Sequence, residues 1–149
     1  MVKQMYACQL KKRYRQKHRS EVEITDEEKT IMKEKLISCL IGYCLGNFLT
    51  AELVARKYAG TSSSQLGESG NPGMANIMLT LGFVPGMITL IGDIAKCVIA
   101  MFLARYLFPD AERNIMFYAG FGATIGHCFP IWRKFKGGKG VAATCIIIF

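Results

Sequence analysis

The first long apolar stretch of the sequence is LISCLIGYCLGNFLTAELVA, residues 36–55, in which Glu52 is the only charged residue. At a rise of 1.5 Å per residue, a helix of this length crosses the hydrocarbon core of a bilayer, about 30 Å. Two more apolar blocks follow at residues 77–104 and 114–132. These blocks predict an all-α, multi-span transmembrane helix bundle.

The middle block, residues 77–104, is consistent either with one tilted helix of 28 residues or with two shorter helices, because Pro85 and Gly86 interrupt it. Asp93 and Lys96 lie inside this block at a spacing of three, which places them on one helix face, where each reduces the other's cost in a membrane. We expect them to form an intramembrane pair, with a structural ion pair favoured over substrate contact.

Composition and charge agree with a membrane protein that has a polar N-terminal segment. The 149 residues are 51% hydrophobic and 20% charged, and the mean hydropathy of +0.23 argues against disorder and against an ordinary soluble domain. The net charge is +8, and residues 1–19 hold seven Lys and Arg with no acidic residue. Such a segment suits a solvated tail, anionic lipid or nucleic acid. We expect residues 1–35 to be a separate basic segment and residues 36–149 to be the membrane domain.

Cysteine spacing and small-residue spacing add two expectations. The six cysteines form no CxxC pair, so neither a disulfide framework nor a metal site is predicted. Glycines at a spacing of four let two helix backbones approach closely in lipid. Three such pairs occur, and they are Gly42/Gly46, Gly82/Gly86 and Gly122/Gly126.

Two polar, glycine-rich segments stand out as candidate phosphate loops. The first, within residues 56–76, contains SGNPGMAN at residues 69–76. The second is GHCFPIWRKFKGGKGVAAT, residues 126–144, in which four cations and the glycines at 137, 138 and 140 adjoin an apolar span. Glycine backbone N–H groups and lysine charges suit a phosphate anion. The second segment is not a Walker A loop, because Arg133 stands at the first glycine position and Gly140 at the Ser/Thr position.

The second segment closely resembles a motif of the bacterial acyl-phosphate:glycerol-3-phosphate acyltransferases, the PlsY family, whose pattern is GHxFPxFxxFKGGKGVAT. Trp132 and Ala143 are the departures from that pattern. The first loop is similar to the family motif SGNxGxTNxxRxxG, and Asp93 and Lys96 fit the family's DxxK. The resemblance covers about residues 36–149.

The resemblance implies transfer of a fatty acyl group from acyl phosphate to the 1-hydroxyl of glycerol 3-phosphate, giving lysophosphatidic acid for phospholipid synthesis. It implies no metal, no cofactor and no nucleic acid, and a functional link to the enzyme that makes acyl phosphate. His127 would act as a base or hold the site together, and Ser69 is a weaker candidate for an acyl nucleophile. The residues expected to bind substrate phosphate are Ser69, Gly70, Asn71, Gly73, Asn76, Lys136, Gly137, Gly138, Lys139 and Gly140.

Three departures from the family pattern leave a second interpretation open. Ala75 replaces a family Thr, and Leu79 replaces an Arg near the substrate phosphate, so another cation substitutes or glycerol 3-phosphate binds less well. A third family motif has no counterpart before Phe149, so we expect a C-terminally shortened acyltransferase. The alternative is a non-catalytic membrane interaction protein that retains the phosphate loops. A membrane-anchored nucleic-acid binder is the other rival, and the lack of interleaved aromatic residues disfavours it.

Topology sets the last expectation. The cytoplasm supplies both phosphorylated substrates, so a multi-pass protein of the cell membrane should face both loops toward it. This arrangement places the basic N-terminal segment outside, against the positive-inside tendency. A natural start at Met32, with residues 1–31 read from upstream sequence, resolves the conflict.

Overall fold

The computed structural model describes the backbone of residues 2–148 and the side chains of residues 13–15 and 22–148. The described backbone is helical, without strands, and the chain divides into two compact units, Met1–Lys33 and Glu34–Phe149. The α-helices are α1 (Val2–Gly46), α2 (Thr50–Ala59), α3 (Met74–Leu81), α4 (Phe83–Leu107), α5 (Ile115–Cys128) and α6 (Val141–Ile148), and two 3-10 turns are η1 (Ser63–Gln65) and η2 (Ile131–Arg133). The predicted all-α fold is confirmed.

The first unit consists of the N-terminal part of α1. Its described side chains are mostly exposed, and Lys29 pairs with Asp26 across 3.4 Å on consecutive helical turns. The basic side chains at positions 3, 11, 12, 17 and 19 lie outside the described side chains. The expectation that this segment meets anionic lipid or nucleic acid therefore stays a prediction.

The first apolar block forms two helices where the sequence predicts one. The α1 helix ends at Gly46, residues 47–49 are not helical, and α2 begins at Thr50. Side chains satisfy the backbone of this break, since the carbonyl of Asn47 accepts a hydrogen bond from Trp132 Nε1 at 2.8 Å and that of Phe48 accepts one from Lys96 Nζ at 2.9 Å. Non-helical backbone in a membrane protein requires such partners.

The middle block also forms two helices, and the interruption lies at Gly82 rather than at Pro85-Gly86. Gly82 has φ +99°, which a residue with a side chain rarely adopts. Pro85 instead lies in the first turn of α4, where a missing N–H leaves no intrahelical bond unmade. The 25-residue α4 that follows carries Asp93 and Lys96.

The third block forms a shorter helix than expected. At 14 residues, α5 is about 21 Å long. Its last turn is closed by the second loop, because the carbonyls of His127 and Cys128 accept hydrogen bonds from the N–H groups of Gly138 and Gly137, both at 3.0 Å. These donors replace the next helical turn, and Pro130 follows.

Two of the three glycine pairs lie where α1 crosses α5. A Cβ atom at Gly42 would lie 1.9 Å from the carbonyl oxygen of Ala119, and one at Gly122 would lie 2.0 Å from that of Cys39. Gly46 and Gly126 are equally confined by the opposite backbone. Only glycine permits this separation of the two backbones. The pair Gly82/Gly86 serves instead at the turn between α3 and α4, where Gly86 adjoins Met78.

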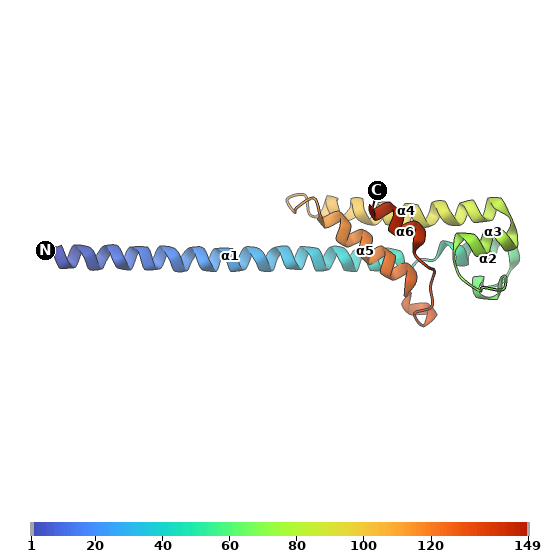
Figure 1. Ribbon diagram of the computed structural model, residues 1–149, viewed down its shortest axis with the longest axis horizontal. Coiled ribbons are helices and arrows are strands. Elements are labelled where there is room, and N and C mark those ends of the chain that lie inside the picture. Colours follow the sequence, from blue (N-terminus) through green and yellow to red (C-terminus); the bar gives the residue numbers. More distant parts are fainter. Residues whose placement is uncertain (1, 149) are drawn as a thin grey trace. The chain divides into compact units, whose positions relative to one another are not determined.

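The cluster packed between α4, α5 and α6 consists of small residues, whereas large apolar residues of these helices lie outside it. Figure 1 shows α5 and α6 lying against α4, and the buried cluster between these helices consists of Cys97, Ala100, Ala104, Ala119, Ala123 and Ala143. Phe102 on α4 and Phe121 on α5 are more than half exposed. Two helical stretches, within Val22–Ala59 and Phe83–Leu107, are long and apolar enough to span a membrane. This distribution of side chains is the one that lipid favours.

Candidate functional site

The first loop, residues 60–73, is held in shape by Asn76. Its buried side chain donates from Nδ2 to the carbonyl of Leu66 at 2.9 Å and accepts from Ser69 Oγ at 2.9 Å. The N–H of Asn71 donates to the same Ser69 hydroxyl at 3.4 Å. Asn76 thus lies beneath the loop and lines neither of the pockets described below. The structure gives Asn76 a role in fixing Ser69 and Asn71, and its contact with phosphate stays a prediction.

The geometry also bears on Ser69 as a nucleophile. Its hydroxyl donates its proton to an amide oxygen, that of Asn76, which is not a base. Activation of a serine needs an adjacent base in hydrogen-bond contact. The hydroxyl is therefore oriented as part of the loop rather than prepared for acyl transfer.

The second loop, residues 129–140, uses its glycines for close approach. A Cβ atom at Gly137 would lie 2.0 Å from the carbonyl oxygen of His127, and one at Gly138 would lie 2.1 Å from His127 Nε2. Because the N–H groups of both glycines already bond to the end of α5, they cannot also donate to a phosphate in this conformation. This differs from the predicted role, in which those N–H groups hold the anion. The contacts of Lys136, Lys139 and Gly140 with phosphate stay predictions.

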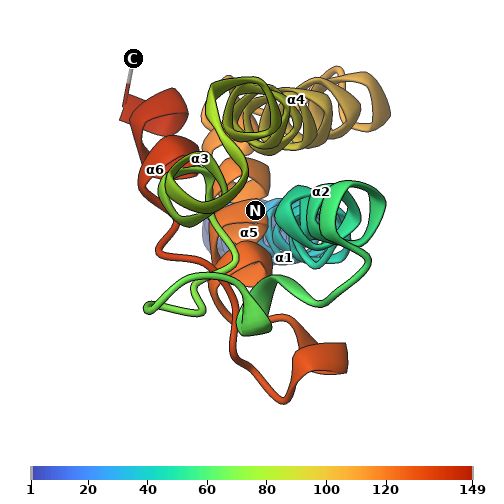
Figure 2. The same cartoon turned by 90° about the vertical axis from the view of Figure 1, so that its right-hand side faces the viewer.

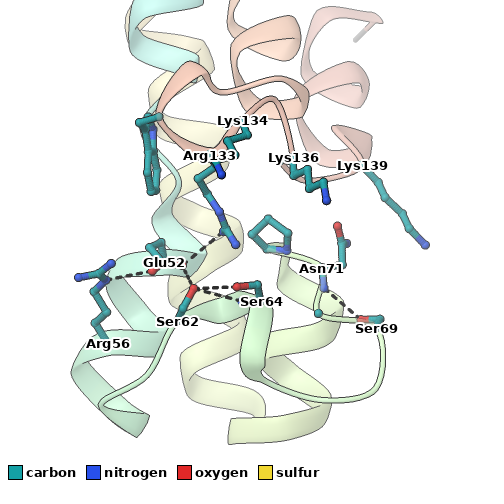
Figure 3. A pocket seen from close by; sticks show the side chains of 14 residues that line it. Glu52, Arg56, Ser62, Ser64, Ser69, Asn71, Arg133, Lys134, Lys136 and Lys139 are labelled. Atoms are coloured by element: carbon teal, nitrogen blue, oxygen red, sulfur yellow. Dashed lines mark hydrogen bonds and ion pairs between the residues drawn. The ribbon is translucent and has the colours of Figure 1, made fainter.

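A polar pocket of about 850 Å³ lies between the two loops (Figure 3). The second loop supplies most of its cations, and α2 and the first loop form the facing wall. Its charged lining comprises five cations, Arg56, Arg133, Lys134, Lys136 and Lys139, and one carboxylate, Glu52. Its uncharged polar lining includes Ser62, Ser64, Ser69 and Asn71. A cavity with this excess of positive charge suits an anion bearing hydroxyl groups.

A second pocket of about 340 Å³ has a mostly apolar lining. The first residues of α3 and of α6 contribute to its wall, together with Leu90, and it also reaches Asp93 and His127. Helix N-termini favour negative charge, and the apolar side chains favour a hydrocarbon chain. This pocket therefore suits a ligand with an anionic end and an apolar body.

Asn71 and Lys139 line both pockets. The two cavities thus meet at one residue from each loop. Figure 2 shows the two loops projecting on the same side of the helices of the second unit. Both loops therefore lie on one side of the fold, as two phosphorylated substrates would require.

A buried polar group lies behind the second pocket. Lys96 Nζ is 2.9 Å from Asp93 Oδ1, 2.8 Å from His127 Nδ1 and 2.9 Å from the Phe48 carbonyl oxygen. The ion pair is close, although Asp93 Oδ1 makes no hydrogen bond of good angle. The three side chains are at most 7% exposed. Lys96 of the predicted pair thus also bonds to His127 and to the non-helical backbone after α1. These contacts favour a structural role for the Asp93–Lys96 pair.

The sequence predicted most of the loop residues that line the polar pocket, but it did not predict the residues of one wall. Ser69, Asn71, Lys136 and Lys139 converge on it as expected, whereas Glu52, Arg56 and Arg133 were not assigned to it. A signal was available, because a lone carboxylate in an apolar block needs partners of opposite charge. Leu79 is 88% exposed and lines neither pocket.

Comparison with known proteins shows the family of this chain. Residues 36–149 match the family model described as glycerol-3-phosphate acyltransferase. The chain is 46% identical over 110 residues to glycerol-3-phosphate acyltransferase 1 of Lactobacillus acidophilus, an alignment covering 74% of this chain and 52% of the relative. It is 40% identical over 115 residues to glycerol-3-phosphate acyltransferase 1 of Lactobacillus johnsonii, covering 77% and 55%.

Among solved structures, the chain is similar to two crystal structures of PlsY, an integral membrane glycerol 3-phosphate acyltransferase. The glycerol 3-phosphate form gives a TM-score of 0.64 at 30% identity, covering 77% of this chain and 56% of that one. The lysophosphatidic acid form gives 0.63 at 28% identity, covering 77% and 55%. The chain spans about half the length of the curated relatives it matches. Because the family model matches residues 36–149 and a relative is 46% identical over 74% of this chain, the chain belongs to the membrane-protein family of the glycerol-3-phosphate acyltransferases.

Proposed function

We propose that this chain carries the substrate pockets for transfer of a fatty acyl group from acyl phosphate to the 1-hydroxyl of glycerol 3-phosphate, in phospholipid synthesis. The observation that carries the proposal is the pair of pockets that meet at Asn71 and Lys139. Two ligands with phosphate groups, one of them with an apolar tail, match one cationic pocket and one apolar pocket. A solved relative, PlsY in its glycerol 3-phosphate form, supports this acceptor.

The lining residues suggest how the two substrates divide between the pockets. Glycerol 3-phosphate is small and polar, which matches the cations and hydroxyls of the polar pocket. The acyl chain of acyl phosphate matches Leu90 and Val141 in the second pocket, and its phosphate matches Lys139 and the N-terminus of α6. Lys139 would then contact both phosphates at the junction of the pockets.

The chemistry needs little from the protein beyond placement. The 1-hydroxyl oxygen attacks the acyl carbonyl carbon, the ester C–O bond forms, and the bond from that carbon to the phosphate oxygen breaks. The hydroxyl proton leaves with the departing phosphate, so no covalent acyl-enzyme is required. Holding the reacting atoms together and stabilising charge on the leaving group supply the rate enhancement. This division leaves Asp93, Lys96 and His127 with supporting roles.

Orientation and domain organisation are part of the same proposal. The multi-pass chain would face both loops toward the cytoplasm, where the phosphorylated substrates and the enzyme that makes acyl phosphate reside. Residues 36–149 would form the acyltransferase part, with the basic residues 1–35 outside it. Labelling of an exposed loop residue, Ser64→Cys, by a membrane-impermeant thiol reagent in intact cells and in inverted vesicles would test this orientation. We expect the cysteine at position 64 to react in inverted vesicles and not in intact cells. The unsubstituted chain is the control.

The function is tested with the chain reconstituted in liposomes and supplied with palmitoyl phosphate and labelled glycerol 3-phosphate. Binding of each substrate is measured alongside the formation of lysophosphatidate. Formation of the product supports the proposal, and failure to bind either substrate contradicts it. Binding of both without any product fits a shortened acyltransferase as well as the alternative, a non-catalytic membrane interaction protein that retains the phosphate loops. Product formation by a chain extended to the length of its relatives would then decide for the acyltransferase.

A further inference from the structure

The polar pocket contains a carboxylate, Glu52, whose contacts the proposed chemistry does not use. Its side chain is 7% exposed and accepts five hydrogen bonds. Oε1 accepts from Arg56 Nε at 2.9 Å. Oε2 accepts from Ser62 Oγ, from the N–H and the hydroxyl of Ser63, and from Arg133 Nη1. One carboxylate thus connects α2, the first loop and the second loop.

Arg133 is the partner that reaches across the pocket to this carboxylate (Figure 3). Its Nη1 lies 3.3 Å from Glu52 Oε2 and donates to Ser63 Oγ at 2.8 Å, while the Ser63 hydroxyl donates to Oε2 at 2.7 Å. The Arg133 side chain is 11% exposed. Both contacts use one nitrogen, so the Nε and Nη2 edge of the planar guanidinium is left to face other acceptors.

We propose that Glu52 is a positioning residue that, with Ser63, fixes the guanidinium of Arg133 so that its second edge receives the phosphate of glycerol 3-phosphate. This inference rests on the proposed function, because it assigns the ligand of the same polar pocket. It goes further by giving a carboxylate a favourable part in the binding of an anion. A bidentate contact with phosphate requires the guanidinium plane to be held in one orientation.

Coulomb's law and positioning predict opposite effects of removing this charge. A carboxylate in an anion pocket repels phosphate, so its neutralisation should tighten phosphate binding if charge alone matters. If Glu52 holds Arg133, neutralisation releases a long side chain whose reordering then opposes binding. The sign of the change in affinity therefore separates the two accounts.

The experiment uses the full chain in phospholipid nanodiscs, with sn-glycerol 3-phosphate as the probe and isothermal titration calorimetry as the readout. Glu52→Gln keeps the shape of the side chain and removes its charge. We expect its Kd to rise at least about fivefold. The matched control is Glu68→Gln, which removes an exposed charge from the first loop outside both pockets and should leave the Kd within about twofold.

A double-mutant cycle tests whether Glu52 acts through Arg133. Arg133→Ala should weaken binding by itself, with the exposed Arg113→Ala as its control. In the Arg133→Ala background, Glu52→Gln should no longer weaken binding, because the side chain that it positions is absent. An equal loss in both backgrounds would assign Glu52 a merely structural role and overturn the proposal.

Ser63→Ala is the second variant in case Glu52→Gln fails to fold, which the melting temperature in nanodiscs would reveal. It removes the hydroxyl that joins Arg133 to Glu52 and should also raise the Kd. An unchanged or lower Kd in the folded variants overturns the positioning role and leaves the proposed function intact. If the unaltered chain binds neither glycerol 3-phosphate nor acyl phosphate, the second probe, both the positioning role and the proposed function are overturned.

Discussion

Lys96 and His127 form a buried hydrogen bond, with Lys96 Nζ 2.8 Å from His127 Nδ1. An ammonium group can only donate, so we assign Nδ1 as the acceptor, which places the ring proton of the neutral histidine on Nε2. That nitrogen adjoins Gly138 in the second loop. In this tautomer Nε2 has no lone pair with which to take a proton. The arrangement favours a structural or donor role for His127 over that of a base.

Two substitutions of His127 should separate the roles of its two nitrogens. Asparagine can offer an oxygen near the position of Nδ1, whereas glutamine can offer an N–H near that of Nε2. Since the Lys96 bond is charge-assisted and worth about 1.5–3 kcal/mol, we expect His127→Gln to lower the melting temperature more than His127→Asn. Thermal unfolding in detergent measures the difference. If both variants fold normally but lose all turnover, the histidine acts as a base, because glutamine keeps an N–H near Nε2 but cannot take a proton.

Replacing Lys96 should cost more than replacing an exposed lysine. Lys96→Met removes the partner of buried Asp93 and leaves the Phe48 carbonyl without its donor. Loss of one partner of a buried ion pair costs about 3–5 kcal/mol. We expect a large drop in melting temperature, with Lys57→Met on the exposed side of α2 as the control. Equal melting temperatures for the two variants would contradict a structural role.

The crossing of α1 and α5 predicts that Gly42→Ala lowers the stability of the protein, whereas helix propensity predicts that it raises it. In an isolated helix, Gly42→Ala is favourable by about 1 kcal/mol. In this fold the added Cβ would lie 1.9 Å from the Ala119 carbonyl oxygen, so the helices must separate and the protein should be less stable. Melting temperatures of Gly42→Ala and of Leu40→Ala, an exposed position on the same helix, provide the comparison. A stabilised Gly42→Ala variant would rule out the close crossing.

Apolar blocks and motif spacing were enough to predict the helical fold and the two loops, because both depend on local sequence. The breaks within the blocks were harder to predict. Residues 47–49 leave the helix because Lys96 and Trp132, far away in sequence, satisfy their carbonyls. The end of α5 likewise depends on Gly137 and Gly138 folding back onto it. A hydropathy profile cannot predict these contacts, because they join residues far apart in the sequence.

The candidate site divides in the same way. Lys136 and Lys139 are recognisable from a motif, and they line the polar pocket as expected. Glu52 and Arg133 lie 81 positions apart, and their contact forms only after the second loop folds against α2. Asn76 belongs to the motif, yet its amide is used up inside the first loop. The motif therefore predicted which residues line or support the polar pocket, but not the contacts that each of them makes.

Lys139 and Lys136 differ in a way that tests the assignment of the two pockets. Lys139 lines both pockets, whereas Lys136 lines the polar pocket alone. Removal of a charge-assisted phosphate contact costs about 1.5–3 kcal/mol, or roughly 10- to 150-fold in affinity. Lys139→Ala should therefore weaken the binding of both acyl phosphate and glycerol 3-phosphate. Lys136→Ala should weaken that of glycerol 3-phosphate alone.

Separate titrations of each variant with the two substrates, at fixed ionic strength, measure these affinities. Lys134→Ala is an informative third variant, because it removes another exposed charge of the polar pocket and should leave acyl phosphate binding unchanged. If the lysines act only through long-range electrostatic attraction, all three variants should lose affinity for both substrates to a similar degree. Such attraction does not distinguish the two substrates. A loss of acyl phosphate affinity confined to Lys136→Ala would reverse the assignment and place the acyl donor in the polar pocket.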